Sequence, residues 1–207
     1  MFLQNVDTET RQQIENLLAL YYRSGGEIPI HLGSLIDLLA NLIDKEIILK
    51  SYDSSKKSDR GHVMPFQGGF NIWLNRLTPF VQRRFTAAHE AGHILRTFDY
   101  NCGKDQMSKQ RIGRESNCIF RNMKEEYICD DIACYILCPQ ELVIKFIEDF
   151  HNIPCQLELF RKRQETSFVA RLKLISKIFE IPTAEFYRYI KRQFGEEKIL
   201  SLINSSQ

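Results

Sequence analysis

Two histidines and a glutamate stand close together in the segment RFTAAHEAGHIL, which runs from residue 84 to residue 95. His89 and His93 are four residues apart, and Glu90 directly follows the first of them. On an α-helix, which turns about 100° per residue, the two histidines lie about 40° apart and one turn from each other. Their imidazole rings can therefore converge on one metal ion, while Glu90 lies beside that ion rather than on it.

This H-E-x-x-H spacing is typical of zinc peptidases. Zinc lowers the pKa of a bound water molecule towards neutrality, and a neighbouring carboxylate takes the proton as that water attacks a carbonyl group. The pattern predicts that His89 and His93 bind Zn²⁺ and that Glu90 is the general base. A histidine pair that binds no metal is the alternative. Small residues around the pair leave room for a packed neighbour or a substrate strand: Ala87, Ala88, Ala91 and Gly92.

A catalytic zinc ion takes three protein ligands and keeps one open position, so a third ligand must come from elsewhere. We favour Glu126, because Asp130 follows it by four residues and helical spacing places both carboxylates on one face. One carboxylate can bind the metal while the other accepts the N–H of a ligating histidine and sets its tautomer. Glu125 and Asp131 compete by the same logic, and a solvated acidic patch is a further alternative. The remaining candidates by chemistry are His31, His62 and His151.

The elements that position these residues follow from the periodicity of the chain. Apolar residues at helical spacing predict a helix that begins at Asp7 or Thr8 and stops at Gly25 and Gly26. A second helix carries apolar residues from position 35 to position 43. Residues 46–52 are a strand candidate, and HVMPF and FNIWLN, on either side of QGG, predict a hairpin. Further helices are expected at 78–98, 124–139, 140–151, 154–164, 167–179 and 183–193, with a short one at the end of the chain.

Composition limits the class of protein. The 207 residues are 43% hydrophobic and 26% charged, as expected for one compact domain or a domain with an extension. A net charge of +2 does not make the whole chain a strong ligand for nucleic acid. We expect a cytoplasmic protein with no membrane partner, because we find neither a signal peptide nor an apolar run long enough to cross a membrane.

The cysteines all lie between residues 102 and 155, and none forms a C-x-x-C pair. Without secretion a disulfide framework is not expected. Three of them fall on one predicted helix, where we expect small buried side chains; a thiolate metal site or a redox site is the alternative. These three are Cys129, Cys134 and Cys138, and the others are Cys102, Cys118 and Cys155.

Two further segments are rich in basic residues. Residues 99–122 are polar and irregular, which predicts a solvated loop or, alternatively, a loop that faces a substrate. Residues 161–193 carry nine lysines and arginines and three glutamates, a net charge of +6. Two short helices there could resemble a helix-turn-helix, and a basic stripe is the usual signature of nucleic-acid binding. Solvated basic helix faces are also common, and we see no separate DNA-binding domain.

Two motifs resemble those of a known family. RRFTAAHEAGHIL resembles the R-x-R-F-T-x-A-H-E-x-G-H signature of the ImmA/IrrE metallopeptidases, and EYICDDIACYILCP resembles their second motif, E-x-x-A-[ND]-x-F-A-x-x-L-L-M-P. The second motif is matched at Glu126, Asp130, Ala133 and Pro139. The chain differs from this motif at Cys129, Ile132 and Cys138, each of which is an apolar replacement. The resemblance runs from about residue 61, with a similar strand hairpin, to residue 139; it weakens through 140–176, and 183–207 look like an extension.

The resemblance implies a zincin-like α+β fold, with a small sheet beside the active-site helix and further helices around them. It implies Zn²⁺ held by His89, His93 and Glu126, with Glu90 as the base. Members of the family act in bacterial cytoplasm on transcriptional repressors, in mobile genetic elements or in the DNA-damage response. We accordingly expect a metallopeptidase core with N-terminal helices at 1–139, and a helical region at 140–207 packed on it.

Two functions are consistent with these features. The first is a zinc endopeptidase that cuts a cytoplasmic protein, expected to be a helix-turn-helix repressor. The second is a DNA-binding or protein-binding regulator whose zinc site is structural or sensory; we favour direct nucleic-acid binding less, because basic helix faces are common and no separate DNA-binding domain is seen. A third, an inert descendant used only for protein contacts, is disfavoured by the intact His-Glu-His set. The substrate and the oligomeric state stay open. So does the oxyanion-stabilising residue, for which the candidates are Tyr100, Tyr127, Tyr135 and His151.

Overall fold

The computed structural model of the protein describes residues 3, 6–56, 58–97, 123–138, 143–144, 168–195 and 197. Within them the fold is mixed α+β, with a small sheet and the elements α1 (Thr8–Arg23), α2 (Leu32–Ile43), β1 (Glu46–Tyr52), β2 (Gly61–Phe66), β3 (Gly69–Asn75), α3 (Phe80–Thr97), α4 (Met123–Leu137), α7 (Phe168–Ile178) and α8 (Thr183–Phe194). The predicted loop at 99–122, the helix at 154–164, most of that at 140–151 and the terminal helix lie outside the described residues.

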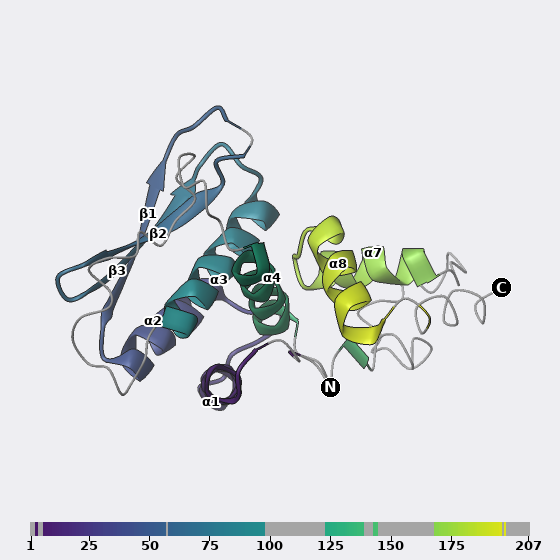
Figure 1. The fold of residues 1–207 in the computed structure, drawn as a ribbon, viewed down its shortest axis with the longest axis horizontal. Helices are drawn as coiled ribbons and strands as arrows, with labels where there is room; N and C mark the ends of the chain where they lie inside the picture. The colour runs from purple at the N-terminus through teal and green to yellow at the C-terminus, as the bar shows by residue number, and fades with distance from the viewer. Residues whose placement is uncertain are drawn as a thin grey trace.

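The sheet has the strand order β1-β3-β2 (Figure 1). β2 and β3 form the predicted antiparallel hairpin, and β1 runs parallel to β3 with Glu46 opposite Gly69. A side chain at Gly69 cannot fit, since its Cβ would lie 1.9 Å from the Glu46 carbonyl oxygen. The glycine pair of the hairpin therefore serves both the turn, where Gly68 has a positive φ of 116°, and the close approach of β1.

The first two helices are capped by their own side chains. Asp7 accepts a hydrogen bond of 2.8 Å from the Thr10 backbone N–H, which confirms it as the N-cap of α1. α1 ends at Arg23, just before the predicted glycine stop. His31 caps α2, because its ring nitrogen Nδ1 accepts a hydrogen bond of 3.3 Å from the Ser34 backbone N–H. The local sequence thus sets where both helices begin.

α3 lies between the sheet and α4 (Figure 1). One of its faces packs with α1, α2, the sheet and part of α4 in a first hydrophobic cluster that includes Leu17, Leu39 and Ile72. The other face joins α4, α7 and α8 in a second cluster that includes Phe179 and Phe186. None of the described helices combines the length and the apolar character needed to span a lipid bilayer.

Candidate metal centre

His89 and His93 both lie on α3, as the spacing predicted. Their ring centroids are 4.9 Å apart and the rings meet edge to face, at 74°. Both residues are buried, with exposed fractions of 2% and 8%. The two imidazoles are therefore neighbours on one helix turn, in a place where a polar nitrogen needs a partner.

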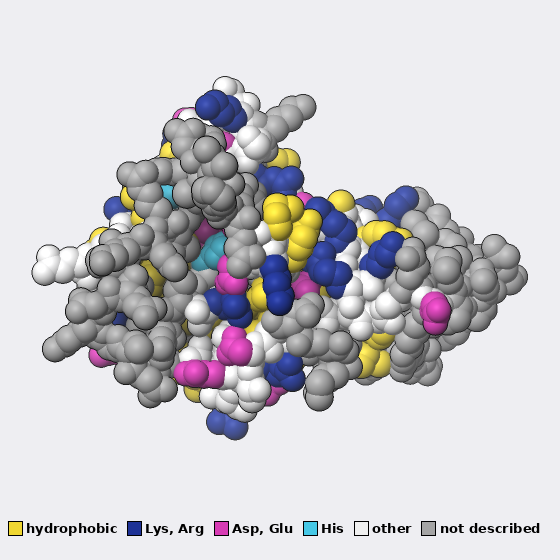
Figure 2. Space-filling view, viewed as in Figure 1, with side chains coloured by type: hydrophobic (Ala, Val, Ile, Leu, Met, Phe, Trp, Pro, Cys, Tyr) yellow, Lys and Arg dark blue, Asp and Glu magenta, His cyan; other side chains and the backbone are white. Residues whose placement is uncertain are grey.

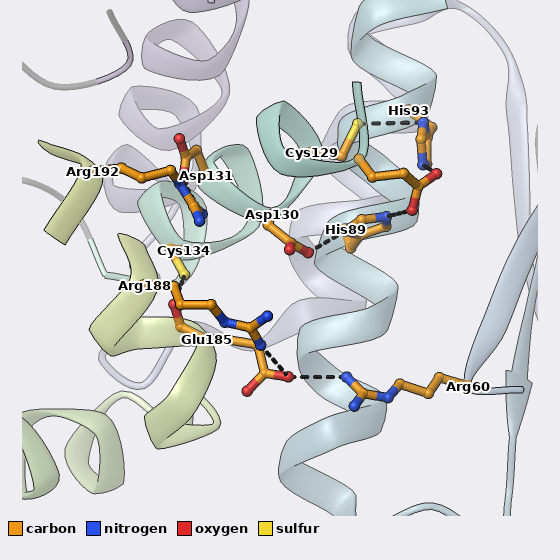
Figure 3. Close-up of polar contacts among 11 residues, drawn as sticks. Arg60, His89, His93, Cys129, Asp130, Asp131, Cys134, Glu185, Arg188 and Arg192 are labelled. Atoms are coloured by element: carbon orange, nitrogen blue, oxygen red, sulfur yellow. Dashed lines mark hydrogen bonds and ion pairs between the residues drawn. The ribbon is translucent and has the colours of Figure 1, made fainter. Parts of the chain in front are cut away.

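α4 crosses α3 at the histidine pair (Figure 3). Gly92 allows this approach, because a Cβ added there would lie only 3.4 Å from Cys129 Cα and from the side chain of Ile132. Ala88 and Ala91 beside it are fully buried. The small residues of α3 hence accommodate a packed helix, the first of the two alternatives that the sequence left open.

Glu126, from the first turn of α4, faces both histidines. Its Oε2 lies 3.5 Å from His89 Nε2, and its Oε1 lies 3.5 Å from His93 Nε2. A tetrahedral zinc ion with bonds of about 2.0–2.2 Å holds its ligand atoms about 3.4 Å apart. The carboxylate is thus separated from each imidazole by about the distance that a shared zinc ion requires.

Asp130, one turn after Glu126, contacts the other side of the His89 ring. His89 Nδ1 lies 2.8 Å from the Asp130 carboxylate and can donate its proton there, so that the neutral form of the ring has its lone pair on Nε2 (Figure 3). That Nε2 is buried, and no hydrogen bond engages it within the described part of the chain. A buried nitrogen that lies 3.5 Å from a carboxylate without a hydrogen bond to it fits a metal ligand, and the donor set of two imidazoles and one carboxylate fits zinc.

The charges at the centre favour an added cation. Burial by itself lowers the pKa of His89, but the carboxylates of Asp130 and Glu126 outweigh it and raise that pKa to about 9. The two imidazoles in turn hold the pKa of the Glu126 carboxyl well below its usual range. Negative charge at this point is therefore balanced by a proton on an imidazole, and a divalent cation can supply the same balance.

Glu90 is 1% exposed and lies next to His89 on α3. Its charge contributes to the raised pKa of His89, so the carboxylate is close to the imidazole. No hydrogen bond or ion pair engages it among the residues that the structure describes. The Glu90 carboxylate is thus buried beside the candidate metal ligands.

Cys129 has a contact that the sequence reasoning did not anticipate. The thiol is fully buried, as predicted, but its Sγ also lies 3.3 Å from His93 Nδ1 (Figure 3). Burial raises the pKa of the thiol, and the nearby carboxylates add to this shift. The signal was present in the spacing, since position 129 follows Glu126 by three residues and so lies on the same face of α4.

The competing carboxylates of α4 are bound elsewhere. Glu125 accepts two hydrogen bonds from Arg96, at 2.5 and 3.0 Å. Asp131 accepts a hydrogen bond of 2.9 Å from Arg192 of α8. The pair Glu125 and Asp131 is therefore not directed at the histidines together, although Glu125 also lies close to His93 and Cys129.

The other candidate histidines do not join the centre. His62 stacks on Trp73, with ring centroids 6.3 Å apart, and alternates along β2 with the buried Val63, so it faces away from α3. His31 caps α2. His151 lies outside the described residues, as do Tyr100, Cys102, Cys118 and Cys155.

The remaining candidate residues on α4 have structural surroundings. Tyr127 lies under the Arg192 guanidinium, 5.5 Å from the ring centroid, and Tyr135 packs against both hydrophobic clusters. Cys134 and Cys138 are buried, and burial raises the pKa of both thiols. These cysteines are therefore core residues, and neither tyrosine is placed at the histidine pair.

The centre thus consists of two imidazoles and a carboxylate that meet at one point, with Asp130 and Cys129 behind the imidazoles and Glu90 beside them. Each of these side chains comes from α3 or α4, so the packing of two helices assembles the whole group.

No protein-family model matches the chain, and no curated protein is significantly similar to it.

Proposed function

We propose that this protein is a zinc-dependent endopeptidase with a zincin-like arrangement, as its resemblance to the ImmA/IrrE metallopeptidases suggests. One observation carries the proposal. The buried Nε2 of His89 lacks a hydrogen bond among the described residues and faces Glu126, which is also 3.5 Å from His93 Nε2. A buried nitrogen without a hydrogen bond is unfavourable, and a metal ion held between it and Glu126 would engage it.

The side chains have separate roles in this proposal. His89, His93 and Glu126 hold the ion, which supplies an activated water molecule and polarises the substrate carbonyl. Asp130 holds the His89 ring in the tautomer that leaves Nε2 unprotonated. Glu90 accepts a proton from the attacking water and passes it to the leaving amine.

The proposed substrate is a cytoplasmic helix-turn-helix repressor, cut at one flexible or inducibly exposed site. A peptidase free in the cytoplasm must avoid general digestion, so contacts outside the cleft must select the substrate. In residues 172–195 the exposed charged side chains are all basic, and Figure 2 shows lysines and arginines gathered over α7 and α8. These residues, Lys173, Lys177, Arg188 and Lys191, can match an acidic face on the repressor.

A metal analysis of protein purified without chelators tests the centre. Wild-type protein should carry about one zinc ion per chain, and Glu126→Ala should lose most of it, as should His89→Ala and His93→Ala. Glu125→Ala is the matched control, because it removes a neighbouring carboxylate of the same helix that already pairs with Arg96. Equal zinc in Glu126→Ala and wild type would show that Glu126 is not the third ligand.

A cleavage assay tests the activity. The protein should cut one purified repressor at one site, more slowly at high salt, and should be nearly inactive on casein and short generic peptides. Broad digestion of unfolded proteins would contradict this account of selectivity. So would cleavage that is unchanged when Lys173, Lys177 and Lys191 are neutralised.

The basic face of α7 and α8 also supports a second candidate function, a DNA-binding regulator with a structural or sensory zinc site. α7 and α8 are joined by only four residues, 179–182, as in a helix-turn-helix. A salt-dependent shift in the mobility of duplex DNA, together with zinc binding but no cleavage of any repressor, would favour this function over the peptidase.

A further inference from the structure

We propose that the Cys129 thiol positions His93 by accepting a hydrogen bond from its Nδ1–H, so that Nε2 is directed at the metal. This inference rests on the proposed zinc site. The Sγ atom lies 3.3 Å from Nδ1, within hydrogen-bond range for sulfur. Cys129 is fully buried and His93 nearly so, which makes such a contact matter more than it would in water.

The arrangement repeats that of His89, with the adjacent residue of α4 as the partner. His89 presents Nε2 to Glu126 and Nδ1 to Asp130. His93 presents Nε2 to the other oxygen of Glu126 and Nδ1 to Cys129. Consecutive residues of one helix thus support the two imidazoles, one through a carboxylate and the other through a thiol.

The tautomer decides the direction of the hydrogen bond. An imidazole that binds metal through Nε2 has its proton on Nδ1, and sulfur must then be the acceptor. In the other tautomer the thiol donates to Nδ1 and the proton lies on Nε2, where it blocks the metal. A thiol can serve in either direction, whereas a carboxylate can only accept, so Cys129 holds the ring in place in both states.

His93 and Cys129 could instead form a separate metal site with Glu125, since these three side chains lie close enough together to share an ion. Arg96 argues against this. Its guanidinium binds both oxygens of Glu125, at 2.5 and 3.0 Å, and already balances that charge. A second cation would have to displace a guanidinium, so the thiol is better used as a hydrogen-bond partner of His93.

The test compares Cys129→Ala with Cys129→Ser, which differ by one hydroxyl group. Both side chains are small enough for the tight contact with Gly92, where a β-branched residue would crowd α3. Zinc affinity is measured by competition with a chelator, and the ring N–H of His93 is followed in ¹⁵N–¹H spectra of the zinc-loaded protein. We expect Cys129→Ala to bind zinc about tenfold more weakly and to lose the slowly exchanging Nδ1–H signal.

Cys129→Ser should recover most of the affinity and the protected signal. A purely structural role would not separate the two variants, because serine and alanine fill nearly the same volume. Equal affinities in Cys129→Ala and Cys129→Ser would overturn the inference and leave the zinc site standing, and so would a second zinc ion that only the wild type binds. A wild-type protein that binds no zinc would overturn the inference and the proposed function together.

Discussion

Two groups of buried charge lie on opposite sides of α4, and they are completed in different ways. The candidate metal centre, defined by His89, His93, Glu126 and the residues around them, lies between α4 and α3. The α8 ion-pair cluster lies where α8 meets α4 and the residue before β2 (Figure 3). It is defined by Arg60, Asp131, Glu185, Arg188 and Arg192. Of two adjacent residues, Asp130 contacts His89 in the first group and Asp131 contacts Arg192 in the second.

In the α8 ion-pair cluster each buried carboxylate has its cation. Asp131 is 2% exposed and pairs with Arg192 at 2.9 Å, while Gln193 donates to its second oxygen at 3.2 Å. Glu185 is 7% exposed and lies 2.9 Å from Arg60 and 3.4 Å from Arg188. The cluster therefore links α8 to α4 and to the start of β2 and needs no further ion.

The candidate metal centre has no such permanent complement, because a proton on an imidazole balances its carboxylates. Its carboxylates meet imidazole nitrogens instead of guanidinium groups, and among the described residues the His89 Nε2 has no hydrogen bond. Burial of charge by itself therefore does not distinguish a functional site from a structural one. What distinguishes them is the kind of opposite charge: a guanidinium keeps its charge, whereas the proton on an imidazole can be replaced by a metal ion.

Glu90→Gln should have the largest effect. Glutamine keeps the shape of the side chain but cannot accept the proton of the attacking water, so cleavage of the repressor should slow by about 10²- to 10⁴-fold. Zinc content should stay near that of wild type, because Glu90 lies beside the ion. Full activity in this variant would rule out Glu90 as the base.

Asp130→Asn should weaken zinc binding by about 10- to 100-fold, because the amide is a poorer acceptor for His89 Nδ1–H. The control is Asp131→Asn on the other side of α4, which should leave the zinc affinity unchanged. Chelator competition measures both variants. If the two lower the affinity equally, the proposed difference between the faces of α4 is wrong.

Arg192→Met should lower the free energy of unfolding by about 1–3 kcal/mol, because it leaves the buried Asp131 carboxylate without its cation. Burial already raises the pKa of Asp131, although Arg192 opposes that shift. The double variant Asp131→Leu/Arg192→Met should recover much of the loss, since it removes the buried charge altogether. Urea titration measures both; an equally unstable double variant would show that the charge is not the cause.

Arg76→Ala should have the smallest effect. Arg76 and Asp53 form a two-bond pair at 2.8 and 2.6 Å, but their side chains are 60% and 52% exposed. Water and salt screen such a pair, so the urea midpoint should not change measurably. A loss as large as that of Arg192→Met would show that geometry, rather than burial, governs these ion pairs.

Much of the molecule could be predicted from the sequence because the signals are local. The cap at Asp7, the hairpin around Gly68 and Gly69, and the strand at residues 46–52 are where the pattern placed them. The convergence of His89 and His93 also follows from helix geometry alone. These features depend on residues within a few positions of one another.

Which face of α4 meets the histidines could not be decided in this way. Glu126 with Asp130, and Glu125 with Asp131, both lie on a single helix, and only the rotation of α4 against α3 separates them. That rotation depends on the packing of α4 against Gly92. It also depends on the hydrogen bonds that Arg96 and Arg192 donate to the carboxylates of α4. The contact of Cys129 with His93 depends on it as well. The sequence by itself determined which residue types could bind a metal, and the tertiary structure decided which of them meet, because their partners are distant in the chain.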